Sequence, residues 1–415
     1  MSDLETLSAA YKNLKSRNQN IDMTRGKPSA AQLDLAAAMF DLVSSDDCKG
    51  ADGTDYRNYG ILAGIPEVRA LFAELMETTP DLVIAGGNGS LQMMYDARLG
   101  AIMFGVPGGD GPWKGAKFLC PVPGYDRHFA ICERLGIEMI PVEMLDDGPD
   151  MDAVEALVAA DASIKGIWCV PKYSNPTGAV YSDLTVDRLA AMKCAAPDFR
   201  IMWDNAYVVH HLTGEIASVK NIQKAADAAG NADRILTFVS TSKISLAGGG
   251  VAAMSASKTN IDDQLERMFY SSIGPDKINQ LRHVRFFKDK AGIEAHMLKH
   301  AAIIGPKFAA VEMAMTKAFD GTGLATWTRP EGGYFVSVDL MDGCAAETVK
   351  LCAEAGVKLT ASGACFPYGK DPRDRNIRLA PTMPTVDELE RAMEIFCTTA
   401  KMVCLKKQAS GHVSA

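Results

Sequence analysis

Residues 239–250 read VSTSKISLAGGG and place a single lysine, Lys243, between an apolar strand and a run of three glycines. The hydroxyl residues Ser240, Thr241 and Ser242 precede this lysine, and hydroxyl groups suit the binding of a phosphate. A lysine enclosed in such a site can have its pKa lowered and can form a Schiff base. Taken alone, the stretch is equally consistent with a surface lysine after a strand, so the remaining motifs must decide.

The region around this stretch alternates between short apolar runs and helical stretches. Seven runs predict strands, at residues 82–85, 117–122, 138–143, 165–170, 200–204, 234–240 and 250–255. Because strands separated by helices need crossover connections, the pattern predicts a mostly parallel seven-stranded sheet between helices. The predicted fold class is therefore α/β, and ligands of such a sheet bind at the carboxyl ends of its strands.

The last third of the chain predicts a second, smaller α+β domain. Its strands are expected at residues 334–340, 357–361 and 376–380. Helices are expected over residues 4–17, 30–44, 258–319 and 385–405. The polar tail 406–415 is expected to be disordered. A length of 415 residues also favours two domains over one.

The composition is that of a globular protein and excludes several classes of function. The net charge of −8 disfavours non-specific binding to nucleic acid or to an anionic membrane. No stretch approaches the ~20 consecutive apolar residues that a membrane helix needs. The N-terminus lacks the basic and then apolar pattern of a signal peptide, so we expect a cytoplasmic protein. Ten scattered cysteines without a C-x-x-C pair indicate neither disulfides nor a metal site.

Several polar motifs lie at the expected ends of strands. Residues 87–91, GNGSL, follow a strand and open a helix, where backbone N–H groups and the helix dipole favour a phosphate. Asp204 ends the strand 200–204 and is followed by Asn-Ala-Tyr. Without further context, Asp204 would be a helix N-cap and residues 87–91 an ordinary turn. Further motifs are PGY at 123–125, SNPTG at 174–178, NIRLAP at 376–381 and RNYGILAGIPE at 57–67.

Taken together and in this order, these motifs resemble the fold-type I enzymes that use pyridoxal 5′-phosphate (PLP), specifically the aspartate aminotransferase family. The resemblance extends from about Gly26 to Arg378 and so covers most of the chain. Residues 24–29, TRGKPS, and residues 273–277, IGPDK, resemble a divergent branch, subgroup Ic, the MocR-type aminotransferases.

The resemblance implies two domains and a reaction. The large PLP-binding domain would span residues 48–290, and residues 1–47 and 291–415 would form the small domain. The implied reaction is transamination between an amino acid and a 2-oxo acid, with L-aspartate or glutamate and 2-oxoglutarate as substrates. The alternatives are an aminotransferase for another amino acid and a PLP-dependent carbon–sulfur lyase. A ligand-sensing regulator is disfavoured because only about 55 residues precede Tyr56, which leaves little room for a DNA-binding domain.

The resemblance also implies how the chain would hold PLP. Lys243 would carry the cofactor, and Asp204 would pair with its pyridinium nitrogen. Tyr207 and Asn175 would bind its 3′-oxygen, and Tyr125 would stack on its ring. The phosphate would lie against Gly89, Ser90, Leu91, Ser240 and Ser242.

The phosphate end departs from the pattern of the family in one respect. Many relatives carry an arginine seven or eight residues after the lysine, and here those positions are Gly250 and Val251. The phosphate would therefore depend more on backbone N–H groups and hydroxyls. Tyr59 would reach the phosphate of the neighbouring subunit, which implies a homodimer with shared active sites. Tyr56 is close enough in sequence to be a rival for this role.

The implied substrate-binding residues are Gly26, Asn175, Arg378 and Arg267. Arg378 would bind the α-carboxylate, because a guanidinium offers paired donors to a carboxylate. A distal carboxylate needs a second cation, and Arg267 of the neighbouring subunit is the first candidate. Arg25 and Lys27 lie near the expected site in the sequence and are rivals for this role.

Overall fold

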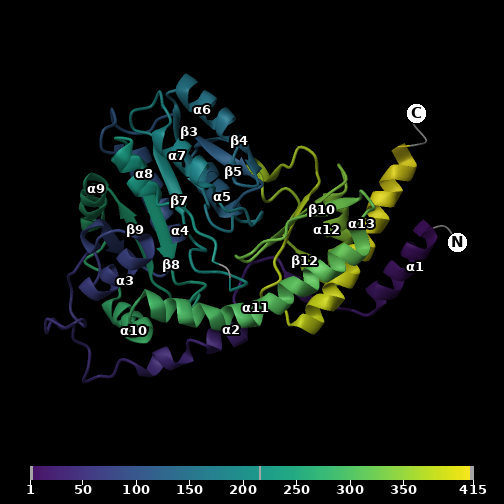
Figure 1. The fold of residues 1–415 in the computed structure, drawn as a ribbon, viewed down its shortest axis with the longest axis horizontal. Coiled ribbons are helices and arrows are strands. Elements are labelled where there is room, and N and C mark those ends of the chain that lie inside the picture. Colours follow the sequence, from purple (N-terminus) through teal and green to yellow (C-terminus); the bar gives the residue numbers. More distant parts are fainter. Residues whose placement is uncertain (1–2, 215, 412–415) are drawn as a thin grey trace.

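The larger part of the molecule is built on one eight-stranded sheet (Figure 1). The structure, a computed structural model, describes residues 3–214 and 216–411. The strands are Val83–Ala85 (β2), Lys117–Val122 (β3), Glu138–Leu145 (β4), Gly148–Pro149 (β5), Ile164–Cys169 (β6), Arg200–Asp204 (β7), Ile235–Ser240 (β8) and Ala252–Ala256 (β9). Their order across the sheet is β2-β9-β8-β7-β6-β3-β4-β5.

The sheet is mostly parallel, which confirms the predicted α/β class. Strands β8, β7, β6, β3 and β4 run parallel to one another, whereas β9 is antiparallel to both of its neighbours. The seven predicted strands correspond to β2, β3, β4, β6, β7, β8 and β9. The eighth, β5, has two residues that pair antiparallel with β4. So short a strand has no hydrophobic periodicity, and for this reason the sequence did not reveal it.

Helices cover both faces of the sheet. One face carries α4 (Ser90–Phe104), α5 (Asp126–Arg134) and α9 (Lys258–Phe269). The other carries α6 (Met151–Ala160), α7 (Asp183–Ala191) and α8 (Ile222–Ala228). Successive strand residues point to opposite faces. In β7, Met202 therefore belongs to the first core, whereas Ile201 and Trp203 belong to the second.

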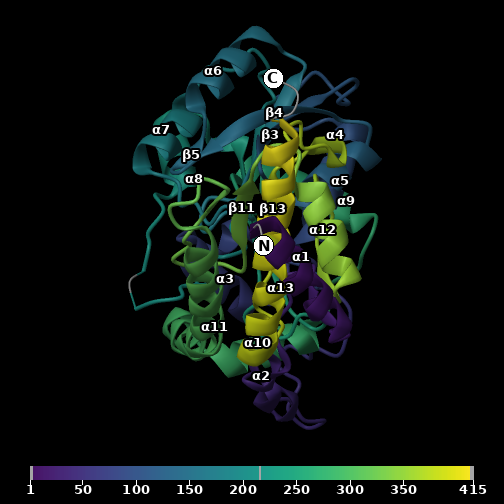
Figure 2. The ribbon, with the colours of Figure 1, turned by 90° about the vertical axis from the view of Figure 1, so that its right-hand side faces the viewer.

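The remaining strands form a second, smaller unit that joins the two ends of the chain. Ala325–Trp327 (β10), Val336–Leu340 (β11) and Asn376–Leu379 (β13) make an antiparallel sheet. Ile21–Met23 (β1) pairs with Val357–Leu359 (β12). The helices of this unit are α1 (Asp3–Ser16), α12 (Ala345–Glu354) and α13 (Val386–Gly411). Figure 2 shows α1 beside α13, and side chains of both helices share one core.

The long helix α11 (Lys290–Phe319) connects the two units (Figure 1). Its first half buries Ile293 and Met297 against α3 (Pro66–Met76) and α10 (Lys277–Phe287). Its second half buries Val311 and Met315 in the core of the smaller unit. The short helix α2 (Ala30–Asp34) contacts α11. Because α11 contributes to both cores, the boundaries predicted at residues 47/48 and 290/291 stay predictions.

Three helical expectations differ from the structure. The region 258–319 forms three helices, because Gly274 and Pro275 interrupt it once and Lys288, with φ +65°, interrupts it again. The region 30–44 forms α2 and a separate 3₁₀ segment, Ala37–Asp41. The expectation of disorder after residue 405 was wrong as far as Gly411, because α13 continues through the helix formers that follow Leu405. Residues 412–415 lie outside the described residues.

Across residues 3–214 and 216–411, no helix combines the length and the apolar character that crossing a membrane requires. The cytoplasmic location stays a prediction.

Replacing Ile167 with alanine is expected to lower the free energy of unfolding by about 2–5 kcal/mol, because the change leaves a cavity in the sheet. Ile167 lies on the central strand β6 and is fully buried. Leu184→Ala is the control, since Leu184 is 67% exposed and its loss should cost no more than about 0.5 kcal/mol. Urea denaturation followed by circular dichroism measures both values. Equal losses of unfolding free energy in Ile167→Ala and Leu184→Ala would contradict the burial of Ile167 in the sheet.

Candidate active site

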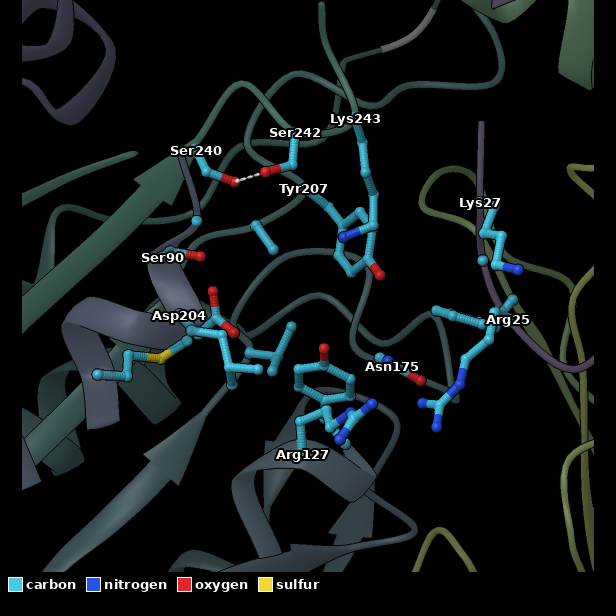
Figure 3. A pocket seen from close by; sticks show the side chains of 18 of the residues that line it. Arg25, Lys27, Ser90, Arg127, Asn175, Asp204, Tyr207, Ser240, Ser242 and Lys243 are labelled. Carbon is cyan, nitrogen blue, oxygen red and sulfur yellow. Dashed lines mark hydrogen bonds between the residues drawn. The ribbon is translucent and has the colours of Figure 1, made fainter. Parts of the chain in front are cut away.

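One cavity of about 410 Å³ opens where β6, β7 and β8 end (Figure 3). Apart from Tyr59 and Arg267, every residue proposed for the site from the sequence lines it. They are Gly26, Gly89, Ser90, Leu91, Tyr125, Asn175, Asp204, Tyr207, Ser240, Ser242, Lys243 and Arg378. The cavity is also lined by Arg25 and Lys27, the two rivals, and by Arg127, Met94, Val170, Ala206 and Phe335, which the sequence did not single out.

Lys243 lies in the loop between β8 and β9, and its side chain points into the cavity (Figure 3). The loop is closed where Thr241 N donates to Val251 O at 2.9 Å. Lys243 Nζ lies 5.0 Å from the centre of the Tyr207 ring. Burial lowers the pKa of Lys243, and the Asp204 carboxylate partly offsets this shift. A lowered pKa makes the neutral, nucleophilic amine more available.

Asp204 ends β7 and presents one unpaired oxygen to the cavity. Its Oδ2 accepts from His128 Nε2 at 2.9 Å, whereas its Oδ1 is buried without a hydrogen-bond partner in the described chain. His128 stacks on Trp168 with ring centres 4.2 Å apart. A buried carboxylate oxygen without a donor is costly. A ligand with a protonated ring nitrogen would supply that donor.

One end of the cavity carries hydroxyls and a helix N-terminus. Gly89 immediately precedes α4, and a side chain there would meet no atom within 4 Å, so its backbone faces open space. Ser240 Oγ donates to Ser242 Oγ at 3.2 Å, and Ser242 Oγ contacts Asn88 O at 3.1 Å. Figure 3 shows these serines and Ser90 on the side away from Arg25 and Arg127. A phosphate fits this end through hydroxyls and N–H groups.

Arg378 lies on β13 and brings the smaller sheet to the cavity. Its Nη1 donates to Asp126 Oδ1 at 2.9 Å and to Asn175 Oδ1 at 3.2 Å. Its Nε is buried and has no partner within the described residues, and the guanidinium lies 4.8 Å from the Phe335 ring centre. The guanidinium is therefore fixed in place while a donor stays free for a carboxylate.

Asp126, which the sequence analysis missed, holds two arginines at once. It accepts from Arg378 and, through Oδ2, from Arg25 at 2.8 Å. Burial opposes its ionisation, but Arg378 and Arg25 together keep the pKa of Asp126 below its ordinary value. Its position directly after the PGY motif was the only signal in the sequence.

Gly26 lies where a side chain would collide with Phe335. A Cβ at this position would lie 2.6 Å from Phe335 Cζ. Only glycine therefore lets the segment that carries Arg25 and Lys27 approach the cavity so closely.

Arg267 lies outside the cavity of its own chain. Its Nη2 donates to Gly105 O at 2.7 Å and to Asp263 Oδ1 at 2.8 Å, and its Nη1 occupies the space that a side chain at Gly100 would need. These contacts anchor the C-terminal part of α9 to α4. The proposed contact between Arg267 and a distal carboxylate receives no support from this position.

Tyr59 is 81% exposed and also lies outside the cavity. Its rival Tyr56 is buried, and its hydroxyl donates to Glu67 Oε2 at 2.7 Å. Of the two, Tyr59 is the one whose ring is available to a neighbouring molecule. Its role at a shared site stays a prediction. No group of three or more His, Cys, Asp or Glu side chains in the described ranges is arranged to hold a metal ion.

Comparison with known proteins identifies the family. The sequence model of the family described as aspartate amino-transferase matches residues 1–412. The chain belongs to the aspartate aminotransferase family. The aspartate aminotransferase of Corynebacterium glutamicum is 45% identical over 409 residues, which cover 98% of this chain and 94% of that protein. A Mycolicibacterium smegmatis protein, provisionally named an aminotransferase, is 49% identical over 395 residues, 94% of this chain and 92% of the relative.

Solved structures of this aminotransferase family agree with the fold. The crystal structure of the C. glutamicum aspartate transaminase superposes with a TM-score of 0.95 at 45% identity, over 97% of this chain and 96% of that one. The family and these relatives make the protein an aminotransferase, and PLP is the cofactor that the family implies.

Replacing Asp126 with asparagine is expected to lower the free energy of unfolding by about 1–3 kcal/mol at pH 7, because buried Arg378 loses its carboxylate partner. The folded-state pKa of Asp126 lies below 3.8, so the contribution is present above that pH. It is lost as the pH falls through the folded-state pKa. Urea unfolding at pH 7, 5, 3.5 and 2.5 measures the difference, with the exposed Asp46→Asn as control. A difference that does not change with pH would contradict the ion-pair assignment.

Proposed function

We propose that this aminotransferase transfers the amino group of L-aspartate to 2-oxoglutarate, and in the reverse direction that of L-glutamate to the 2-oxo acid of aspartate, with PLP bound to Lys243. The observation that carries the proposal is the placement of Lys243 between the unpaired Asp204 Oδ1 and Arg378 around one cavity. The 45% identity to a protein named aspartate aminotransferase supports this substrate class.

The residues present fit PLP. Asp204 Oδ1 would accept from the ring nitrogen, and Tyr125 would cover one face of the ring. Asn175 Oδ1 is occupied by Arg378, so the amide nitrogen of Asn175 would meet the 3′-oxygen together with Tyr207. The phosphate would take the N-terminus of α4 with Ser90, Ser240 and Ser242. When bound, PLP supplies an electron-withdrawing ring that eases the breaking of bonds at the substrate Cα.

The chain itself would orient the substrate and move the proton. Arg378 would hold the α-carboxylate and so align the Cα–H bond for cleavage. Lys243 Nζ would take the Cα proton as a general base and return a proton as a general acid. The lowered pKa of Lys243 supports this role, since a neutral amine is needed to accept the proton. The buried walls formed by Val170 and Phe335 would help to exclude water.

Arg127 and Lys27 are the cations that we propose for the distal carboxylate. Both line the cavity, and within the described part of the chain neither side chain has an ion pair or a hydrogen bond, since the hydrogen bonds of Lys27 are made by its backbone. Arg25 is instead paired with Asp126, and Arg267 is held by its own chain. The side chains of Arg127 and Lys27 are therefore available to a second substrate carboxylate in the cavity that Arg378 also lines.

The shared homodimeric site, with Tyr59 of one subunit at the phosphate of the other, also remains part of this proposal. So does membership of subgroup Ic, which rests on residues 24–29 and 273–277. The exposed ring of Tyr59 supports the proposal of a shared homodimeric site.

Single-turnover absorbance of the PLP-loaded protein tests the proposal. L-Aspartate should shift the cofactor band, and Lys243→Ala should lower the rate of this half-reaction by at least about a thousandfold, because the acid and base are lost. Lys299→Ala is the control, since Lys299 is exposed on α11. A near-native rate for Lys243→Ala would refute the role of this lysine. Release of a thiol, pyruvate and ammonia from an amino acid that carries sulfur on Cβ, without a 2-oxo acid, would indicate a carbon–sulfur lyase instead.

Replacing Arg127 with glutamine should raise KM for L-aspartate about tenfold or more and change KM for L-alanine less than about twofold, because only aspartate has a second carboxylate. Lys27→Gln should have a smaller effect of the same kind, because its flexible ammonium makes a single contact. Arg267→Gln serves as the comparison and should leave the aspartate-to-alanine ratio unchanged. A collapse of that ratio in Arg267→Gln alone would restore the assignment made from the sequence.

A further inference from the structure

Three buried side chains, His210, Tyr334 and His296, converge on two consecutive backbone carbonyls at Lys243 and Ile244, and a fourth, His300, contacts His296. We propose that His210, Tyr334, His296 and His300 form a carbonyl clamp that positions the backbone of Lys243 for its reaction. The inference rests on the proposed role of Lys243 as the cofactor lysine. None of these four residues lines the cavity, so they act through Lys243 and are positioning residues.

Two side chains donate to the Lys243 carbonyl, one from a residue that precedes Lys243 in the sequence and one from a residue that follows it. His210 Nε2 lies 3.3 Å from Lys243 O, and Tyr334 Oη lies 3.4 Å from it. His210 belongs to the loop after β7, and Tyr334 immediately precedes the strand region of β11. Both are buried, so water does not compete for the carbonyl. One donor therefore comes from the loop after β7 and the other from the smaller unit, and both contact the same oxygen, Lys243 O.

The Ile244 carbonyl is held by one histidine of α11, which in turn contacts a second. His296 Nε2 lies 2.8 Å from Ile244 O and 3.0 Å from His300 Nε2. Because a carbonyl can only accept, His296 Nε2 must carry a proton. His300, one turn further along α11, therefore supports the histidine that holds this peptide oxygen.

Gln32 of α2 links the two halves of the clamp. Its Nε2 donates to Tyr334 Oη at 2.9 Å and to His300 Nδ1 at 3.1 Å. Its Oε1 accepts from Ser29 N at 3.0 Å, which fixes the orientation of the amide. The Gln32 amide therefore restrains the side chains of both Tyr334 and His300.

The histidines hold the loop without adding charge beside Lys243. Burial, followed by the nearby Lys243, lowers the pKa of His210 well below its ordinary value. Burial also lowers the pKa of His296, and burial followed by His296 lowers the pKa of His300 to about 4. Charged imidazoles here would repel a protonated Lys243 amine. Neutral donors fix the two carbonyls and leave the Lys243 side chain free to swing.

Such a clamp matters because the Lys243 amine must reach two positions while the backbone of Lys243 stays in one place. The amine alternates between the cofactor and the substrate Cα, and both distances depend on where the Lys243 backbone lies. A displacement of about 1 Å in a reacting group can cost up to about a hundredfold in rate. Hydrogen bonds from three side chains on three separate segments restrict that displacement.

The test uses the full-length, PLP-loaded enzyme and two variants that remove one donor each. Tyr334→Phe removes a single oxygen, and Tyr11→Phe is its matched control, because Tyr11 Oη donates to another backbone carbonyl, Leu351 O, at 3.0 Å in the smaller unit. His296→Leu removes the donor to Ile244, and His296→Gln restores a neutral one. Borohydride reduction and peptide mass analysis establish whether the cofactor is attached to Lys243.

We expect kcat per bound cofactor to fall about tenfold in Tyr334→Phe and His296→Leu, with KM changed less than about twofold. The pH titration of the cofactor absorbance should also shift in these two variants. Tyr11→Phe should match the wild type, and His296→Gln should recover most of kcat. If His296→Leu does not fold, Tyr334→Phe decides.

Two outcomes would overturn the clamp, and they are distinguishable. Cofactor on Lys243 with unchanged kcat and unchanged titration in both variants, even at a lower melting temperature, would leave the four residues a purely structural role. Cofactor attached to another lysine would overturn the proposed function and the clamp together.

Discussion

A carboxylate buried at the end of a central strand is the constraint on which the rest of the site depends. Asp204 is 2% exposed, and His128 satisfies only one of its oxygens. Burying a charge in this way is costly unless the surroundings compensate it. Trp168 and Tyr125 pack around His128 and hold it against Asp204. The cavity thus has one position that favours a protonated ring nitrogen, and the other groups are arranged relative to it.

The second constraint is that one cavity is built from two units. Asp126, from α5 of the large sheet, holds Arg378 of the smaller sheet. The long helix α11 belongs to both cores and carries His296 and His300 to the loop of the catalytic lysine candidate. The arginine proposed to bind the carboxylate and the lysine proposed as the base, which come from different units, therefore keep a fixed separation. Ion pairs and buried hydrogen bonds, rather than the sheet alone, maintain it.

The sequence predicted those parts of the site in which chemistry and local structure coincide. Lys243 and Asp204 lie at strand ends within short motifs, so residue type and position could be inferred together. Asp126 and His128 were missed because their partners lie far away in the sequence; Arg378 is 252 residues from Asp126. Arg127 was missed because it belongs to no motif and is recognised only by its place on the cavity.

By itself, the sequence determined the α/β class, the seven principal strands and the motifs that meet at their carboxyl ends. Alternating apolar runs and turn residues act over a few neighbours, and a linear pattern therefore records them. Only the tertiary structure decided which cations are free. Arg25 and Arg267 have the same chemistry as Arg127, but each is already paired with a carboxylate, Asp126 or Asp263. Pairing of charges depends on distances across the fold, and those distances are set by packing rather than by spacing along the chain.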